Sequence, residues 1–168
     1  MICALMIGRA GSKGFPGKNL KKILGRSLYE YSLVAAKKSK YIDRIFISSD
    51  CPTIIRGGKK YGATIIKRPR KLADSKALGE DVFRHGYFEI LKKLKLDSKK
   101  IEFIVLLMAN APTVTEKLID KGINILKKNK NLDSAVTTSV YNMWSPLRAR
   151  KMDKNKLLKP FIPFRAFG

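Results

Sequence analysis

The chain has 168 residues, of which 45% are apolar, and its 36 Lys and Arg residues against 13 Asp and Glu give a formal net charge of +23. This size fits one domain with a substantial core, and the composition excludes the disordered and fibrous classes. No apolar run is long enough for a membrane helix, and the first, Ile2 to Ile7, is too short and lacks the cationic lead-in of a signal peptide.

The positive charge is spread along the chain in lysine pairs such as Lys21-Lys22, Lys59-Lys60 and Lys127-Lys128. A charge of this size can indicate nucleic-acid or membrane-surface binding. We expect most of these lysines to be solvated instead, because the sequence has no recognised nucleic-acid module and no aromatic–basic stacking motif. Nucleic-acid binding is kept as an alternative that only the charge supports.

The first predicted element is a strand over Ile2 to Ile7, which runs directly into a loop rich in glycine and cations, Gly8 to Asn19. Glycine allows close approach of the backbone to a ligand, and successive N–H groups form a concavity that binds anions. Arg9, Lys13 and Lys18 add full positive charges. The loop therefore predicts binding of a nucleotide triphosphate, and the alternative is a flexible, solvated turn.

Strand and helix patterns alternate beyond the loop. The predicted helices are 28–40, 52–61, 79–94 and 115–128, and Ser27 can cap the first of them. The predicted strands are 44–48, 64–66, 101–107 and 133–140. The segment 68–78, between the strand 64–66 and the helix 79–94, is predicted to be a loop. The nearly continuous apolar run over 101–107 is typical of a strand buried on both faces. Asp50, two residues before Pro52, is expected to cap a short helix, and a place near a metal is its alternative.

Strand–loop–helix units in this order predict a three-layer α/β fold with a mainly parallel, Rossmann-like sheet. Ligands of such sheets bind at the carboxyl ends of the strands. Four segments should lie there: Gly8 to Asn19, Ser48 to Pro52, Met108 to Thr115 and Val140 to Trp144. Residues 1–142 are the predicted nucleotide-binding domain. The periodicity then stops, and 143–168 is predicted to be an extended arm.

Five residues of the first loop carry a resemblance to a known family. The order Arg-x-x-Ser-Lys-x-x-x-x-Lys-Asn, formed by Arg9, Ser12, Lys13, Lys18 and Asn19, resembles the signature of the acylneuraminate cytidylyltransferases. Further similar stretches are 41–50, 61–63, 68–74 and 106–113, so the resemblance covers roughly Ala4 to Val140. It implies a sheet of the nucleotide-diphospho-sugar transferase type and transfer of CMP from CTP to a sialic acid-like nonulosonic acid, with release of pyrophosphate.

The resemblance also implies roles for individual residues. Arg9 and Lys18 would be catalytic, since cations stabilise the charge that builds on the α-phosphate and the leaving pyrophosphate. The implied nucleotide-binding residues are Arg9, Ala10, Gly11, Ser12, Lys13, Asn19, Arg68 and Asn110. Arg68 would help to read the cytosine. Arg148 and Arg150 would bind the acidic sugar through their planar guanidinium groups, with a surface pair as the alternative.

Two positions depart from the family's pattern. Met108 stands where the family has glutamine and Val114 where it has arginine, so sialic acid itself need not be the substrate, and Asn110 is expected to supply a nearby polar group. The family uses Mg²⁺, but the resemblance assigns no metal ligand in this chain, because the family's metal-binding aspartates lie C-terminal to it. We expect either a fragment, or nucleotide binding without efficient turnover, or a metal held mainly by triphosphate and water.

Together these features predict a cytoplasmic, CTP-dependent nucleotidyltransferase with CTP and an acidic nine-carbon sugar as its partners. Cys3 and Cys51 lack metal-ligand spacing and favour a reducing compartment. A homodimer is expected through the region of the arm, which would begin a dimerisation or sugar-binding segment. The alternative from another class is a truncated, non-catalytic domain that binds a nucleotide or a partner protein.

Overall fold

The computed structural model describes residues 1–11, 14–74, 76–138 and 150–162. Its contacts divide the chain into two compact units, Met1–Val136 and Thr137–Gly168. The described part of the second unit contains an antiparallel pair, β7 (Arg150–Met152) and β8 (Leu158–Pro160). The domain boundary predicted between 142 and 143 lies outside the described residues. Within the described ranges, no helix is long and apolar enough to cross a membrane.

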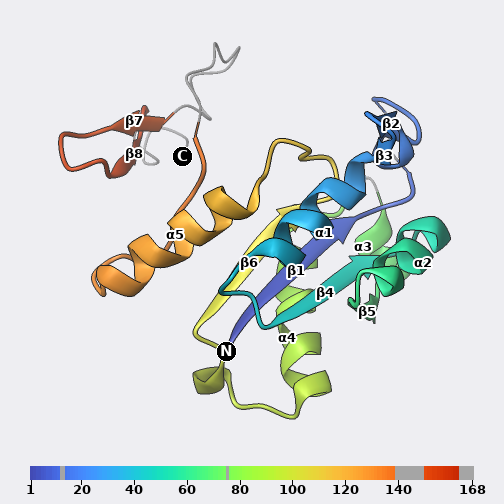
Figure 1. Cartoon of the computed structure of the whole chain (residues 1–168), viewed down its shortest axis with the longest axis horizontal. Helices are drawn as coiled ribbons and strands as arrows, with labels where there is room; N and C mark the ends of the chain where they lie inside the picture. Colours follow the sequence, from blue (N-terminus) through green and yellow to red (C-terminus); the bar gives the residue numbers. More distant parts are fainter. Residues whose placement is uncertain (12–13, 75, 139–149, 163–168) are drawn as a thin grey trace. The chain divides into compact units, whose positions relative to one another are not determined.

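The first unit is built on a parallel sheet of four strands (Figure 1). The strands are β1 (Ile2–Gly8), β4 (Arg44–Ser49), β5 (Thr64–Lys67) and β6 (Phe103–Met108), in the spatial order β5-β4-β1-β6. The chain moves outward from β1 through β4 to β5 and then returns to β6 on the other side of β1. The strand order therefore reverses between β1 and β6, and such a reversal opens a crevice at the carboxyl ends of the strands.

Helices cover both faces of this sheet. They are α1 (Leu28–Lys38), α2 (Pro52–Lys60), α3 (Arg70–Ala73), α4 (Gly79–Leu94) and α5 (Glu116–Lys128). Two 3₁₀ turns, Lys18–Leu20 and Ser98–Lys100, and a small hairpin of β2 (Lys22–Ile23) and β3 (Arg26–Ser27) complete the described elements of the first unit.

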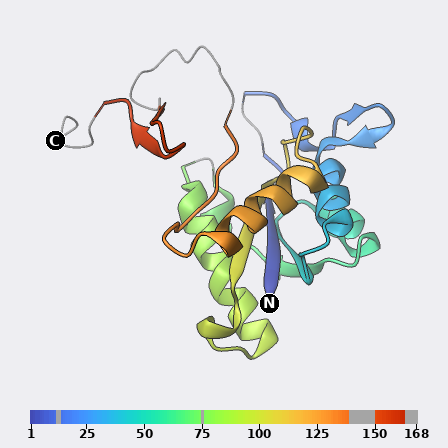
Figure 2. The same cartoon turned by 60° about the vertical axis from the view of Figure 1, so that its left-hand side comes forward.

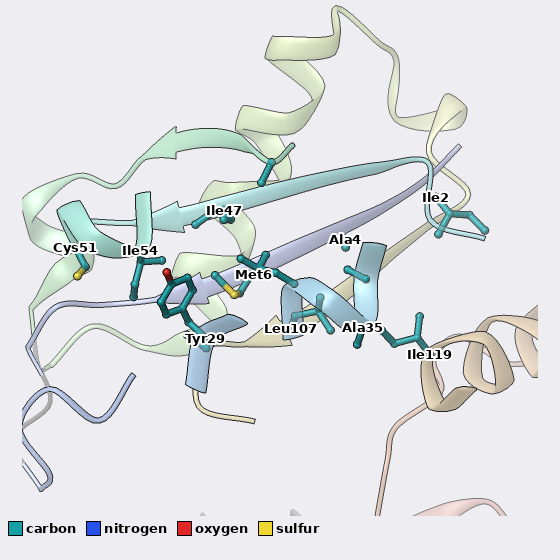
Figure 3. Close-up of a cluster of buried hydrophobic side chains, with 14 of the residues drawn as sticks. Ile2, Ala4, Met6, Tyr29, Ala35, Ile47, Cys51, Ile54, Leu107 and Ile119 are labelled. Atoms are coloured by element: carbon teal, nitrogen blue, oxygen red, sulfur yellow. The ribbon is translucent and has the colours of Figure 1, made fainter. Parts of the chain in front are cut away.

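Alternation along β1 produces two cores, because successive side chains of a strand point to opposite faces. Ile2, Ala4 and Met6 pack with side chains of α1, α2 and α5 (Figure 3). Cys3, Leu5 and Ile7 pack with side chains of α4, and Figure 2 shows β1 between α4 and α1. The predicted three-layer α/β fold is thus confirmed, and Cys3 is a buried free cysteine in one of the two cores.

The start of α1 is held as its sequence predicts. Ser27 is the N-cap, and its backbone N–H donates to Glu30 Oε2 over 2.8 Å in a capping box. The other carboxylate oxygen of Glu30 accepts from the Tyr61 hydroxyl at 3.0 Å. The bond from Tyr61 ties α1 to the residue that follows α2.

Three sequence expectations about elements are wrong. β6 is an edge strand rather than one buried on both faces, and its Leu106 and Met108 are each 44% exposed, because no described strand lies on its outer side. The predicted strand 133–140 is not formed over its described part, 133–138, where no neighbouring strand supplies a hydrogen-bonding partner. A short helix, α3, forms inside the predicted loop 68–78, where Leu72 packs against the α4 core.

Candidate functional site

A pocket of about 470 Å³ lies at the carboxyl ends of β1 and β6. It is lined by Ile7, Gly8, Arg9, Gly14, Phe15, Lys18, Asn19, Arg68, Leu72, Ala77, Gly79, Val82, Met108 and Asn110. It brings together five of the site residues proposed from sequence: Arg9, Lys18, Asn19, Arg68 and Asn110. These residues come from three segments of the chain, and the parallel order of the strands places them at one edge of the sheet.

The other proposed residues lie elsewhere. Ala10 and Gly11 are exposed and are not among the lining residues. Ser12, Lys13 and Arg148 lie outside the described residues, as do 140–144, the fourth segment predicted for this edge. Arg150 is an exposed residue of β7 in the second unit.

Gly8 explains why the pocket opens where it does. A Cβ atom at Gly8 would lie 2.6 Å from the Cβ of Ala109, so only glycine permits the close approach of the two strand ends. The Ala109 N–H donates to the Ile7 carbonyl over 3.1 Å and extends the pairing by one residue. The glycine-rich loop and the turn that carries Asn110 therefore leave the sheet side by side.

Asn19 lines the pocket and has a side-chain acceptor that no described residue uses. The left-handed backbone of Gly17, with φ of 67°, starts the 3₁₀ turn that carries Lys18 and Asn19. Asn19 is 7% exposed, and its Nδ2 donates to the Arg9 carbonyl over 3.0 Å. Its Oδ1 is buried and has no hydrogen-bond partner among the described residues. Since a buried polar atom without a partner is costly, this oxygen is suited to accept from an N–H or O–H of a ligand.

Arg68 is held as a fixed cation at the end of β5. The residue is 8% exposed, its Nε donates to Ser48 Oγ over 3.3 Å, and its Nη2 donates to the Ser48 carbonyl. Burial lowers the pKa of the guanidinium, the Asp50 carboxylate opposes this, and the nearby Arg9 lowers the pKa further. An arginine remains protonated in such surroundings, so the positive charge stays at the pocket wall.

Asp50 does not cap α2 as the sequence suggests. The N-cap is Cys51, and the Asp50 Oδ1 accepts from the Ala10 N–H over 2.9 Å. The register of the sheet explains this contact, because Gly8 on β1 is paired with Ser49 on β4, and the residues that follow each strand continue alongside one another. Sequence reasoning missed the bond because it joins residues 40 positions apart.

The lining of the pocket carries three cations, Arg9, Lys18 and Arg68, and no described carboxylate. A concentration of positive charge in a partly desolvated pocket, next to the free acceptor of Asn19, suits a phosphorylated ligand that also has a hydrogen-bond donor. Across the described ranges, no three His, Cys, Asp or Glu side chains gather as metal ligands would. These residues therefore do not form a protein cage for Mg²⁺.

The two residues that depart from the family pattern, Met108 and Val114, lie in different surroundings. Met108 lines the pocket beside Asn110, so a thioether is found where the resemblance expects an amide. Val114 is partly buried and packs against the core formed with α1, α2 and α5. An apolar side chain therefore contributes to packing at the position where the family has an arginine.

Comparisons with known proteins identify a family and a fold for the chain. A family model described as cytidylyltransferase matches residues 3–159. Among curated proteins, the chain is 28% identical over 151 residues to "Pseudaminic acid cytidylyltransferase and UDP-2,4-diacetamido-2,4,6-trideoxy-beta-L-altropyranose hydrolase" of Helicobacter pylori, covering 89% of this chain and 28% of that protein. It is 27% identical over 161 residues to "CMP-N,N'-diacetyllegionaminic acid synthase" of Legionella pneumophila, covering 95% and 66%.

A third relative is "Post-translational flagellin modification protein B" of Campylobacter coli, 32% identical over 137 residues, or 81% of this chain and 55% of that protein. The chain thus spans between 28% and 66% of the length of these three relatives.

Two solved structures share the fold. CMP:2-keto-3-deoxy-manno-octonic acid synthetase complexed with CTP matches with a TM-score of 0.59 at 18% identity, over 78% of this chain and 49% of that one. A cytidylyltransferase from Leptospira borgpetersenii matches with a TM-score of 0.56 at 20% identity, over 77% and 50%. These likenesses show a common α/β architecture.

Proposed function

Because the chain belongs to the cytidylyltransferase family, we propose that it transfers CMP from CTP to a sialic acid-like nonulosonic acid and releases pyrophosphate. The observation that carries the proposal is the pocket at the β1 and β6 ends, which combines Arg9, Lys18 and Arg68 with the unpartnered Oδ1 of Asn19. The cations suit a triphosphate, and the free acceptor suits a hydroxyl or amino group of a nucleoside.

The chemistry is an in-line displacement at phosphorus. The anomeric hydroxyl oxygen of the sugar forms a bond to the α-phosphorus of CTP, the bond from that phosphorus to the bridging oxygen breaks, and pyrophosphate leaves while the hydroxyl proton passes to solvent. Arg9 and Lys18 stabilise the charge that develops on the phosphoryl oxygens and the leaving group. Ser12 and Lys13, in the same loop, hold the phosphates together with the N–H group of Gly11, since the N–H of Ala10 is bound to Asp50.

Arg68 contributes to reading the base. Two of its five N–H donors bind Ser48, and the others can donate to the carbonyl oxygen of cytosine. Because the group is buried and fixed, it loses little conformational freedom when it binds the nucleotide. Asn110, on the opposite wall, supplies a further polar contact to the nucleotide.

Mg²⁺ enters the reaction as part of the substrate MgCTP in this proposal. The described residues offer no cluster of metal ligands, so the metal is held by the triphosphate and water, and it partly neutralises the phosphate charge. Removal of Mg²⁺ by a chelator should therefore weaken turnover without unfolding the chain.

The acceptor is an acidic nine-carbon sugar. Relatives of the chain include enzymes named for pseudaminic and legionaminic acid, and an N-acylneuraminate cytidylyltransferase. We propose that Arg148 and Arg150 bind the sugar carboxylate and that the active form is a homodimer. Met108 at the pocket wall favours a nonulosonic acid other than sialic acid itself.

A second candidate function is a non-catalytic domain that binds a nucleotide or a partner protein. The observation that favours it is that the described residues hold no group of three or more metal-ligating side chains. The two candidates agree on nucleotide binding and differ on turnover.

Pyrophosphate release by the 168-residue chain distinguishes them. The assay combines MgCTP with a panel of pseudaminic, legionaminic and N-acetylneuraminic acids, with the sugar-free reaction as the control. Steady, sugar-dependent release that Lys18→Ala abolishes would support the transferase. CTP binding without release for any sugar would reject the catalytic proposal and support the binding domain.

A further inference from the structure

We propose that Asp50 is a positioning residue for the phosphate-binding loop, because its carboxylate fixes one peptide unit at the start of that loop before a nucleotide binds. The proposal rests on the proposed function of the pocket. It concerns a residue that is not among the lining residues and that the sequence suggests is a helix cap.

The geometry singles out the peptide bond between Arg9 and Ala10. Its N–H, from Ala10, donates to the Asp50 Oδ1 over 2.9 Å, and its carbonyl, from Arg9, accepts from the Asn19 Nδ2 over 3.0 Å. One planar peptide unit is therefore held at both its polar groups, by residues from two different segments. Because the unit is planar, two such contacts fix its orientation and hence the direction in which the Arg9 side chain leaves the backbone.

The position of Asp50 follows from the sheet. Gly8 and Ser49 are the last paired residues of β1 and β4, so Asp50 follows its strand in step with Arg9 and Ala10. Ser49 also accepts at its Oγ from the Cys51 N–H over 3.0 Å, which fixes the turn that carries Asp50. The carboxylate is thus presented to the loop by a rigid strand end.

The charge of Asp50 also acts on the pocket. Burial and the nearby Arg9 lower the pKa of the Arg68 guanidinium, and the Asp50 carboxylate opposes both effects. The carboxylate therefore offsets the repulsion between Arg9 and Arg68 when no triphosphate is present. The hydrogen bond and the charge are separable, because Asp50→Asn keeps an acceptor oxygen without the charge and Asp50→Ala removes both.

If Asp50 positions the loop through its hydrogen bond to Ala10, Asp50→Ala should weaken MgCTP binding about tenfold, which corresponds to about 1.4 kcal/mol. Asp50→Asn should stay within about threefold of the unmodified chain, because its amide oxygen can still accept from Ala10. A carboxylate that merely competed with phosphate would give the opposite result, and both variants would bind MgCTP more tightly.

Calorimetric titration of the 168-residue chain with MgCTP and with inorganic triphosphate measures these affinities. The matched control is Asp97→Ala, because Asp97 also accepts from a backbone N–H, that of Lys99 over 3.0 Å. Asp97 precedes β6, so it lies at the amino end of that strand, away from the pocket. Should Asp50→Ala fail to fold, Asp50→Ser takes its place, because the shorter hydroxyl does not reach Ala10. Equal or tighter binding by the alanine or serine variant would overturn the proposal, as would an asparagine variant as weak as alanine.

Hydrogen exchange of the Ala10 amide tests the bond between Asp50 and Ala10 in the absence of a nucleotide. Asp50→Ala should accelerate this exchange at least about tenfold, and Asp50→Asn and Asp97→Ala should leave it nearly unchanged. Unchanged exchange in Asp50→Ala would overturn the proposal. A chain that binds no CTP would instead reject the proposed function, and exchange at Ala10 would still decide whether Asp50 holds the loop.

Discussion

Asn19 combines two roles in one amide group. Its Nδ2 donates to the Arg9 carbonyl, and its buried Oδ1 has no partner in the part of the chain that the structure describes. We expect Asn19→Ala to weaken CTP binding about tenfold, because it loosens the loop and removes the acceptor offered to the ligand. Calorimetry measures the change. Asn129→Ala is the matched control, since that amide also donates to a carbonyl, of Ile125, but at the end of α5. Equal losses in both variants would contradict a specific role for Asn19.

A substitution at Arg68 tests whether the pocket needs the several N–H donors of a fixed guanidinium group or only a positive charge. Lysine has one ammonium group and cannot bind both the Ser48 hydroxyl and the Ser48 carbonyl in the geometry of a guanidinium. Arg68→Lys should therefore weaken CTP binding about tenfold or more and cost about 1–3 kcal/mol of folding stability. Arg70→Lys, at an exposed position of α3, is the control and should change neither quantity. A lysine variant that binds CTP normally would show that charge alone suffices.

At this scale the sequence predicted part of the site. The spacing of Arg9, Lys18 and Asn19 after a strand indicates a phosphate loop, and the structure places these residues in one pocket with Arg68. Their roles in binding stay predictions. The role of Asp50 was not predictable, because a residue just before a helix with Pro at its start resembles a cap, and only the register of two strands brings it to Ala10.

The contact between α4 and β1 sets the position of one pocket wall, because Gly79 and Val82 of α4 line the pocket. A Cβ at Gly86 of α4 would lie 2.5 Å from the Leu5 Cδ2, and Leu5 is fully buried. Gly86→Ala should therefore destabilise the fold by about 1–3 kcal/mol, measured by urea denaturation. Gly122→Ala in α5 is the matched control.

At Gly122 a Cβ would make only an ordinary contact of 3.7 Å with Ala135. Helix propensity then decides the outcome, and the variant should be stabilised by up to about 1 kcal/mol. If Gly86→Ala were as stable as Gly122→Ala, the close packing of α4 on the sheet would be wrong.

Elements with strong local signals were predictable. The apolar run of β1, the cap at Ser27 and the period of α4 place these elements close to their observed bounds. The apolar composition of β6 predicts a central strand, but the number of neighbouring strands is not encoded in the strand itself. For the same reason the β-forming residues of 133–138 do not make a strand without a partner beside them.

For the whole molecule, the net charge of +23 is compatible with a pocket for a triphosphate and with nucleic-acid binding, and salt dependence distinguishes the two. A triphosphate bound by three cations in a pocket should lose affinity moderately, by about tenfold, between roughly 50 mM and 500 mM salt, because screening is weaker for partly buried charges. A duplex oligonucleotide should not displace CTP in a fluorescence competition at about 150 mM salt, where exposed charges are screened beyond about 8 Å. A duplex that displaces CTP and binds with a steep salt slope would favour nucleic-acid binding.

The preference of the 168-residue chain among nucleotides tests the central claim most directly. Calorimetric titration with CTP, GTP and ATP, each with Mg²⁺, measures it under one set of conditions. A pocket that reads cytosine through the fixed donors of Arg68 and the free acceptor of Asn19 should bind CTP at least about tenfold more tightly than either purine nucleotide. Equal affinities for all three, or a preference for a purine, would contradict the assignment of this pocket to CTP.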